Sequence, residues 1–143
     1  AIEEDYVAPA LGWAVTQKLP IIFICEDNDL SVLTKTEDRR SWKAVDLAKS
    51  LNMYAVDIAD DPWLIAHHVK KINKSGKPGF INIRTVRGIW HAGTGVDNEL
   101  EWNRYELVEK EIATMGLSQE MIGINLKNKE KVDLIWQKLQ QKL

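Results

Sequence analysis

Cysteine and long apolar runs are the features that this sequence of 143 residues has least of. Its one cysteine, Cys25, excludes an internal disulfide, and its place inside an apolar segment predicts a buried thiol. No apolar run approaches the roughly 20 residues of a membrane-spanning helix, so we expect no membrane partner. Internal repeats and low-complexity tracts are absent from the sequence as well.

An excess of charge of either sign is also lacking. The net charge of −2 gives no reason to expect nucleic acid or an anionic membrane as a partner. Hydrophobic residues make up 45% and charged residues 28%, as in an ordinary folded domain. The length suits one domain, which we expect over residues 1–143 with a helical extension from about residue 101.

Strand-like and helical segments alternate along the chain. Short apolar runs predict strands at Ile21–Cys25, Met53–Ile58 and Phe80–Ile83. Helical spacing predicts helices over Glu4–Lys18, Trp42–Leu51, Pro62 to about Ile72, Glu101–Met115 and Asn128–Leu143, and the polar segment Ser31–Ser41 is expected to be a loop. Strands separated by helices favour an α/β fold in which helices flank a parallel sheet.

The end of the first predicted strand carries the most informative chemistry. Its apolar run is expected to face water on neither side, and it leads directly into Glu26, Asp27 and Asn28. Ligands of open parallel sheets bind beyond the carboxyl ends of strands, and a carboxamide oxygen there suits a hard cation such as Mg²⁺. A solvated acidic loop is the alternative on local chemistry alone, and Asp27 competes with Asn28 as the metal ligand.

A second cluster, Arg84–Gly93, follows the third predicted strand and should reach the same edge of the sheet. Arg87 and His91 in this glycine-bearing segment suit a diphosphate, which attracts cationic and hydrogen-bonding groups. The alternative is a solvated arginine and a surface imidazole.

These segments together resemble a known family. Residues 1–30, with Lys18-Leu19-Pro20, the apolar strand and Glu26-Asp27-Asn28, resemble the cofactor-binding segment of thiamine diphosphate enzymes, above all the alpha subunit of the dehydrogenase component in 2-oxo acid dehydrogenase complexes. The resemblance covers roughly residues 1–115 and implies the second half of a thiamine diphosphate-binding domain. The family's Gly-Asp-Gly motif would fall just before Ala1, so the expected source is a truncated, proteolytic or naturally split protein.

The resemblance also implies roles for individual residues. Asn28 and the backbone carbonyl of Leu30 would bind Mg²⁺, and the N–H of Ala1 would meet the diphosphate. Arg87 would bind the diphosphate, and His91 would lie beside the cofactor and assist acyl transfer. Two departures stand out: Asp29-Leu30-Ser31 replaces a more typical small-aromatic-small pattern, and Ala92 stands where some members carry a regulatory serine.

The implied activity is oxidative decarboxylation of a 2-oxo acid with acyl transfer to a lipoyl carrier. The implied partners are a pyrimidine-binding domain or beta subunit and a lipoyl-bearing acyltransferase, in a hetero-oligomer. The alternatives are ketol transfer, as in transketolase, and a non-catalytic interaction domain. We expect a cytoplasmic location, although the lack of a targeting peptide carries no information when the native start is expected to be missing.

Overall fold

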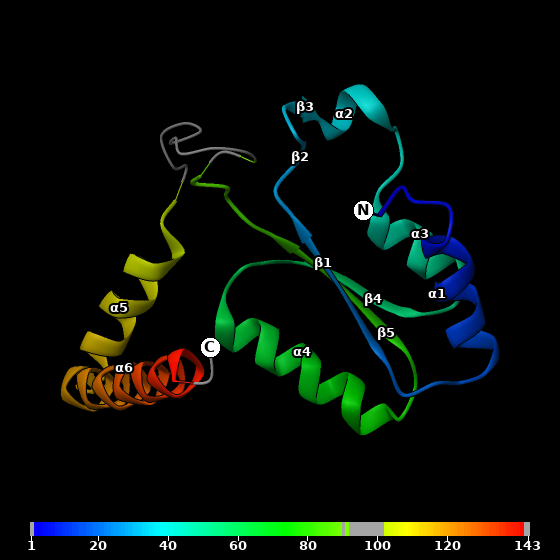
Figure 1. Cartoon of the computed structure of the whole chain (residues 1–143). Coiled ribbons are helices and arrows are strands. Elements are labelled where there is room, and N and C mark those ends of the chain that lie inside the picture. The colour runs from blue at the N-terminus through cyan, green and yellow to red at the C-terminus, as the bar shows by residue number, and fades with distance from the viewer. Residues whose placement is uncertain (1, 90, 92–101, 142–143) are drawn as a thin grey trace. The chain divides into compact units, whose positions relative to one another are not determined.

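The computed structural model describes residues 2–89, 91 and 102–141, and it has the α/β architecture that the sequence predicts (Figure 1). The chain divides into two units, Ala1–Trp102 and Asn103–Leu143. In chain order the elements are α1 (Val7–Thr16), β1 (Ile22–Asp27), β2 (Leu30–Ser31), β3 (Thr34–Lys35), α2 (Thr36–Arg39), α3 (Ala44–Ser50), β4 (Tyr54–Ala59), α4 (Pro62–Ser75), β5 (Gly79–Arg84), α5 (Arg104–Thr114) and α6 (Ser118–Gln140).

The first unit is built on a three-stranded parallel sheet in the order β1-β5-β4. The register places Ile24 of β1 and Val56 of β4 on either side of Ile81 in the central strand. Parallel pairing requires crossovers, which the helices supply. The predicted fold class is therefore confirmed.

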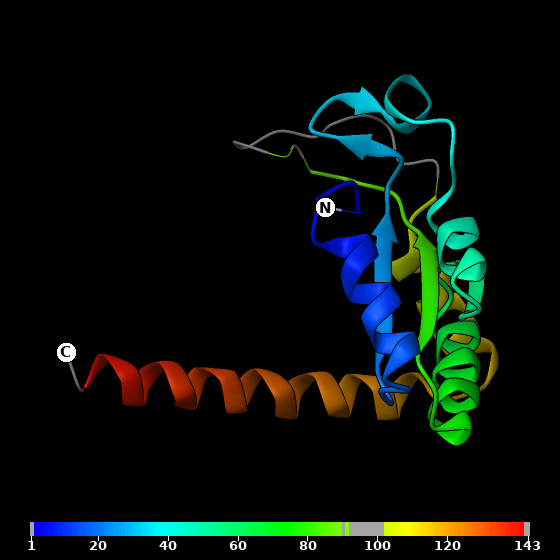
Figure 2. The ribbon, with the colours of Figure 1, turned by 90° about the vertical axis from the view of Figure 1, so that its right-hand side faces the viewer.

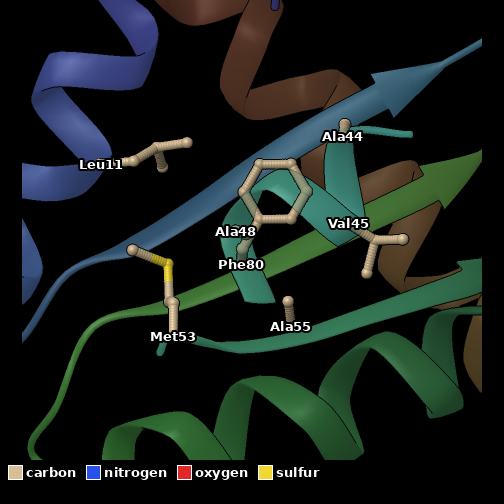
Figure 3. Packing of buried hydrophobic residues seen from close by; sticks show 7 residues of the cluster. All are labelled: Leu11, Ala44, Val45, Ala48, Met53, Ala55 and Phe80. Atoms are coloured by element: carbon tan, nitrogen blue, oxygen red, sulfur yellow. The ribbon is translucent and has the colours of Figure 1, made fainter. Parts of the chain in front are cut away.

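Two clusters of apolar side chains cover the two faces of the sheet. On one face, α1 and α3 pack around Phe80, whose ring lies in the middle of the cluster in Figure 3. On the other face, Ile72 of α4 packs against Ile58 of β4 and Ile81 of β5. The alternation of Phe80 and Ile81 toward opposite faces follows from the two-residue period of a strand.

The ends of α4 follow the chemistry of its sequence. Asp61 caps the helix by accepting a hydrogen bond from the N–H of Leu64 at 2.8 Å, and Pro62 occupies the first turn. At the other end Gly76 adopts a left-handed conformation, with φ of 64°, as many helix C-termini require.

Three expectations about local structure need correction. Ile24 is 54% exposed, because β1 pairs only with β5 among the described strands and α4 covers the β4 and β5 side of that face. The segment Ser31–Ser41 contains β3 and α2, which lack the apolar periodicity that would predict them. Helix α6 begins at Ser118, ten residues before the predicted start.

The second unit contains α5 and α6. Asn103 caps α5, where its side-chain oxygen lies 3.4 Å from the N–H of Glu106. No described residue of either helix is buried, and large apolar side chains such as Trp136 stay exposed. Across the described ranges, no helix has the length and apolar character needed to cross a membrane.

Gly79 offers a direct test of packing at the start of β5. A Cβ atom on Gly79 would lie 2.6 Å from the side chain of Ile72, which is only 3% exposed. We expect Gly79→Ala to lower the free energy of unfolding by about 1–3 kcal/mol, because the buried isoleucine must move. Gly12→Ala is the control, since a Cβ at this α1 position meets nothing within 4 Å. It should leave stability unchanged or raise it by up to about 1 kcal/mol. Equal urea midpoints for the two variants would contradict this account.

Candidate functional site

A tight loop carries the chain from β1 into the β2–β3 hairpin. The side-chain oxygen of Asn28 accepts the N–H of Leu30 at 3.1 Å, and a carboxylate oxygen of Asp27 accepts the N–H of Asp29 at 3.1 Å. Asp29 itself has a φ of 61°, in the left-handed region that aspartate tolerates better than most residues. These two hydrogen bonds join residues two positions apart, and they stabilise a turn that contains no glycine. They place Asn28 at the carboxyl end of β1, as predicted.

The segment after β5 reaches this same hairpin. Arg87 Nη1 donates a hydrogen bond to the carbonyl oxygen of Val32 at 2.6 Å. Val32 has a φ of 56°, which is an uncommon conformation for a β-branched residue and marks a strained turn. Figure 1 and Figure 2 both show β2, β3 and α2 beyond the carboxyl end of β1. The structure therefore brings Arg87 of the second predicted cluster to the hairpin that follows the first cluster.

A pocket of about 580 Å³ lies beside this loop. Asn28 and Leu30 line it together with Arg39 and Arg40, over an apolar floor that includes Phe80. Its volume falls within the range of small-molecule sites, roughly 300–1,000 Å³. The edge of the sheet thus offers amide oxygen, backbone and guanidinium groups around one cavity.

The two arginines of the pocket are the main feature that sequence analysis missed. Both guanidinium groups pair with the carboxylate of Glu3, and Arg40 Nε lies 2.9 Å from Glu3 Oε1. Arg40 also donates to the carbonyl oxygen of Trp42 at 2.6 Å and stacks over its ring at 4.5 Å. The Arg39-Arg40 pair within a polar run was the available signal, but such a run is usually a solvated surface.

A buried amide links the carboxyl ends of the three strands. Asn82 of β5 is 6% exposed, and its Nδ2 donates to Asp57 Oδ1 of β4 at 3.0 Å and to Asp27 Oδ2 of β1 at 3.3 Å. Arg84 Nε lies 3.5 Å from the same Asp57 oxygen. Sequence analysis did not single out Asn82. Its bridging position fixes Asp27, the residue next to Asn28.

This fold resembles part of a transketolase. The solved structure of the transketolase from Campylobacter jejuni matches with a TM-score of 0.54 and 21% sequence identity. The match covers 59% of this chain and 14% of that chain, so this chain corresponds to a small part of the whole enzyme. At this identity the similarity establishes the fold. No family model matches the sequence, and no curated protein matches it either.

The groups around the pocket suit a diphosphate that carries Mg²⁺. They include too few metal ligands to bind Mg²⁺ without the diphosphate. The amide oxygen of Asn28 keeps a second lone pair beside the one that accepts the Leu30 N–H. Leu30 lies in β2 opposite Lys35, at the wall of the pocket. Among the described residues, no group of three His, Cys, Asp or Glu side chains is placed to hold a metal ion. Further anionic ligands would therefore have to come from the diphosphate and from outside the described residues.

The structure does not connect the two remaining predicted site residues, His91 and Ala1, with the pocket. His91 is exposed, and no described contact connects it to the pocket. Its role therefore stays a prediction. Ala1 lies outside the described residues, so its predicted contact with the diphosphate stays a prediction too.

Cys25 is half-buried at the pocket wall. Burial first, and then the nearby Asp27 carboxylate, raises the pKa of its thiol above the usual value. The thiol therefore stays protonated at neutral pH. The predicted burial of this thiol is confirmed only in part, because Cys25 is half-buried.

Proposed function

We propose that this chain forms part of the cofactor site of a thiamine diphosphate-dependent enzyme. The observation that carries the proposal is that Arg87 reaches the hairpin that follows Asn28, beside a pocket that Asn28, Arg39 and Arg40 line. The similarity to part of a transketolase supports it, because it agrees with the α/β fold on which these residues lie.

Different residues of the chain would bind the metal ion and the diphosphate of the cofactor. Asn28 and the Leu30 carbonyl would bind Mg²⁺, while Arg87 and the Ala1 N–H would bind the diphosphate. The guanidinium groups of Arg39 and Arg40 would exchange Glu3 for phosphate oxygens, since a phosphate carries more charge than a carboxylate. Thiamine diphosphate supplies the carbanion chemistry when it is bound, and the protein supplies position and charge.

The proposed reaction is oxidative decarboxylation of a 2-oxo acid with transfer of the acyl group to a lipoyl carrier. The spacing of Arg87 and His91 supports this branch, and His91 would assist the acyl transfer. Ketol transfer between sugars is the second candidate, favoured by the transketolase similarity. Both reactions require a pyrimidine-binding domain or beta subunit, and the first also requires a lipoyl-bearing acyltransferase. The exposed apolar residues of α6 are consistent with such a hetero-oligomer.

The test is an activity assay of the complete protein assembled with its partner subunit. We expect acylation of a lipoyl carrier from a 2-oxo acid in the presence of Mg²⁺ and thiamine diphosphate. Ketol transfer between sugar phosphates, with no acylation, would select the second candidate. Calorimetry that detects no cofactor binding by the assembly would instead indicate a non-catalytic interaction domain.

The isolated chain provides a second test. Because its described residues supply only part of a metal site, we expect no tight binding of thiamine diphosphate and Mg²⁺ to the 143 residues alone. Titration calorimetry that gives micromolar affinity for the isolated chain would contradict this division of the site.

A further inference from the structure

A second pocket lies at the opposite, amino-terminal edge of the sheet. It has a volume of about 470 Å³ and is formed where α1 ends, where β4 begins and where α4 leads into β5. Its polar lining consists of Lys18, Asn52, Tyr54, Lys71, Ser75 and Lys77. All belong to the first unit. None of them lines the pocket beside Asn28.

Positive charge dominates this second pocket. Among the residues that the structure describes, three lysines line it and no carboxylate does. No ion pair or hydrogen bond of the described residues engages the ammonium groups of Lys18, Lys71 or Lys77. Lys71 instead lies over the ring of Tyr54, with its Nζ 4.5 Å from the ring centroid. The helices α1, α3 and α4 end at this edge, and each C-terminus carries a partial charge of about −0.5. Together these offset only part of three full positive charges.

Hydrogen bonds within the protein hold two parts of the pocket wall in place. The hydroxyl of Tyr54 lies 2.8 Å from His68 Nδ1, which orients the ring against α4. Burial first, then His67 and Lys71, lowers the pKa of His68, so the imidazole is neutral and its Nδ1 can accept a hydrogen bond from the Tyr54 hydroxyl. Ser75 Oγ donates to the Ile72 carbonyl at 2.7 Å and accepts the Lys77 N–H at 3.1 Å. This pair of bonds fixes the turn that carries Lys77.

The rest of the lining is apolar. Val15, the buried Ile72 and the buried Pro78 supply a surface that cannot hydrogen-bond with a ligand. A free inorganic anion would use only the lysines. A ligand with an apolar body as well as an anionic group would use both parts of the pocket.

We propose that this second pocket binds a small organic phosphate, with its dianionic group among Lys18, Lys71 and Lys77 and its apolar body against Val15, Ile72 and Pro78. Lysine acts toward phosphate as a point charge, and a dianion matches three ammonium groups better than a monoanionic carboxylate does. The site lies across the sheet from Asn28 and does not depend on the proposed function.

Phenyl phosphate is the probe, because it combines a phosphate dianion with an apolar ring. We expect a titration of the full chain, followed by amide NMR signals, to shift Asn52, Tyr54, Ser75 and Lys77. Inorganic phosphate and benzoate should each bind at least about tenfold more weakly, since the first lacks the ring and the second carries one negative charge where phenyl phosphate carries two. The pKa of His68 should rise on binding, because a nearby anion favours the imidazolium form.

Two double variants distinguish binding in the pocket from a general effect of positive charge on the protein. Lys71→Gln with Lys77→Gln should weaken phenyl phosphate binding by at least about tenfold. Lys70→Gln with Lys74→Gln removes the same charge from α4 at exposed positions outside the pocket lining, and it should have little effect. If the first pair destabilises α4, Lys18→Gln tests the same point, because Lys18 lines the pocket from outside α4. It should also weaken phenyl phosphate binding. Equal losses in both pairs, shifts confined to Asn28 and Arg39, or no saturable shift would each overturn the proposal.

Discussion

Replacement of Asn28 by alanine is expected to weaken Mg²⁺-dependent binding of thiamine diphosphate to the assembled protein by roughly 100-fold or more. Loss of a residue that only supports a metal ligand typically costs about 10–100-fold, and Asn28 is proposed as a ligand itself. The variant should still fold, because the bond from the Leu30 N–H to Asn28 Oδ1 contributes only about 1 kcal/mol. Calorimetry with and without Mg²⁺ measures the effect.

Two control variants make this result specific. Asn28→Asp keeps an oxygen at the same position and should retain most of the metal-dependent affinity. Asn73→Ala removes an exposed asparagine from α4 and should change nothing. If Asn28→Ala binds the cofactor as tightly as Asn73→Ala does, Asn28 is not a metal ligand and the residue serves only the turn.

Much of the fold was predictable because the decisive signals are local. The Asp61-Pro62 pair specifies the start of α4, and Gly76 permits its end, whatever the rest of the chain does. Short apolar segments likewise located all three strands of the sheet. The exposure of Ile24 was not predictable, because it depends on how far α4 extends across the sheet.

The site was predictable to the extent that it follows from topology. Asn28 and Arg87 follow strands that run parallel, so they had to reach the same edge. The roles of Arg39 and Arg40 depend on Glu3, which lies more than thirty positions away and pairs with both. The bridge made by Asn82 similarly requires β4 and β1 to lie on either side of β5. Such contacts depend on the fold, and no local pattern encodes them.

Replacement of Arg87 by alanine should have the second largest effect on the cofactor. We expect about a 10–100-fold loss of thiamine diphosphate affinity, as for removal of a charge-assisted hydrogen bond that contributes about 1.5–3 kcal/mol. Arg87→Lys should recover only part of the affinity, because lysine keeps the charge but loses the planar fork of donors. Titrations of the assembled protein with thiamine diphosphate measure both variants.

A purely structural role for Arg87 makes a different prediction, because its Nη1 also supports the strained turn at Val32. If Arg87 binds the diphosphate, the loss caused by Arg87→Ala should be larger for thiamine diphosphate than for thiamine monophosphate. If it only supports the turn, both ligands should lose affinity equally. Val32→Gly should then restore binding to Arg87→Ala, since glycine adopts positive φ without strain. Equal losses together with rescue by Val32→Gly would remove Arg87 from the diphosphate site and leave it as a support of the hairpin.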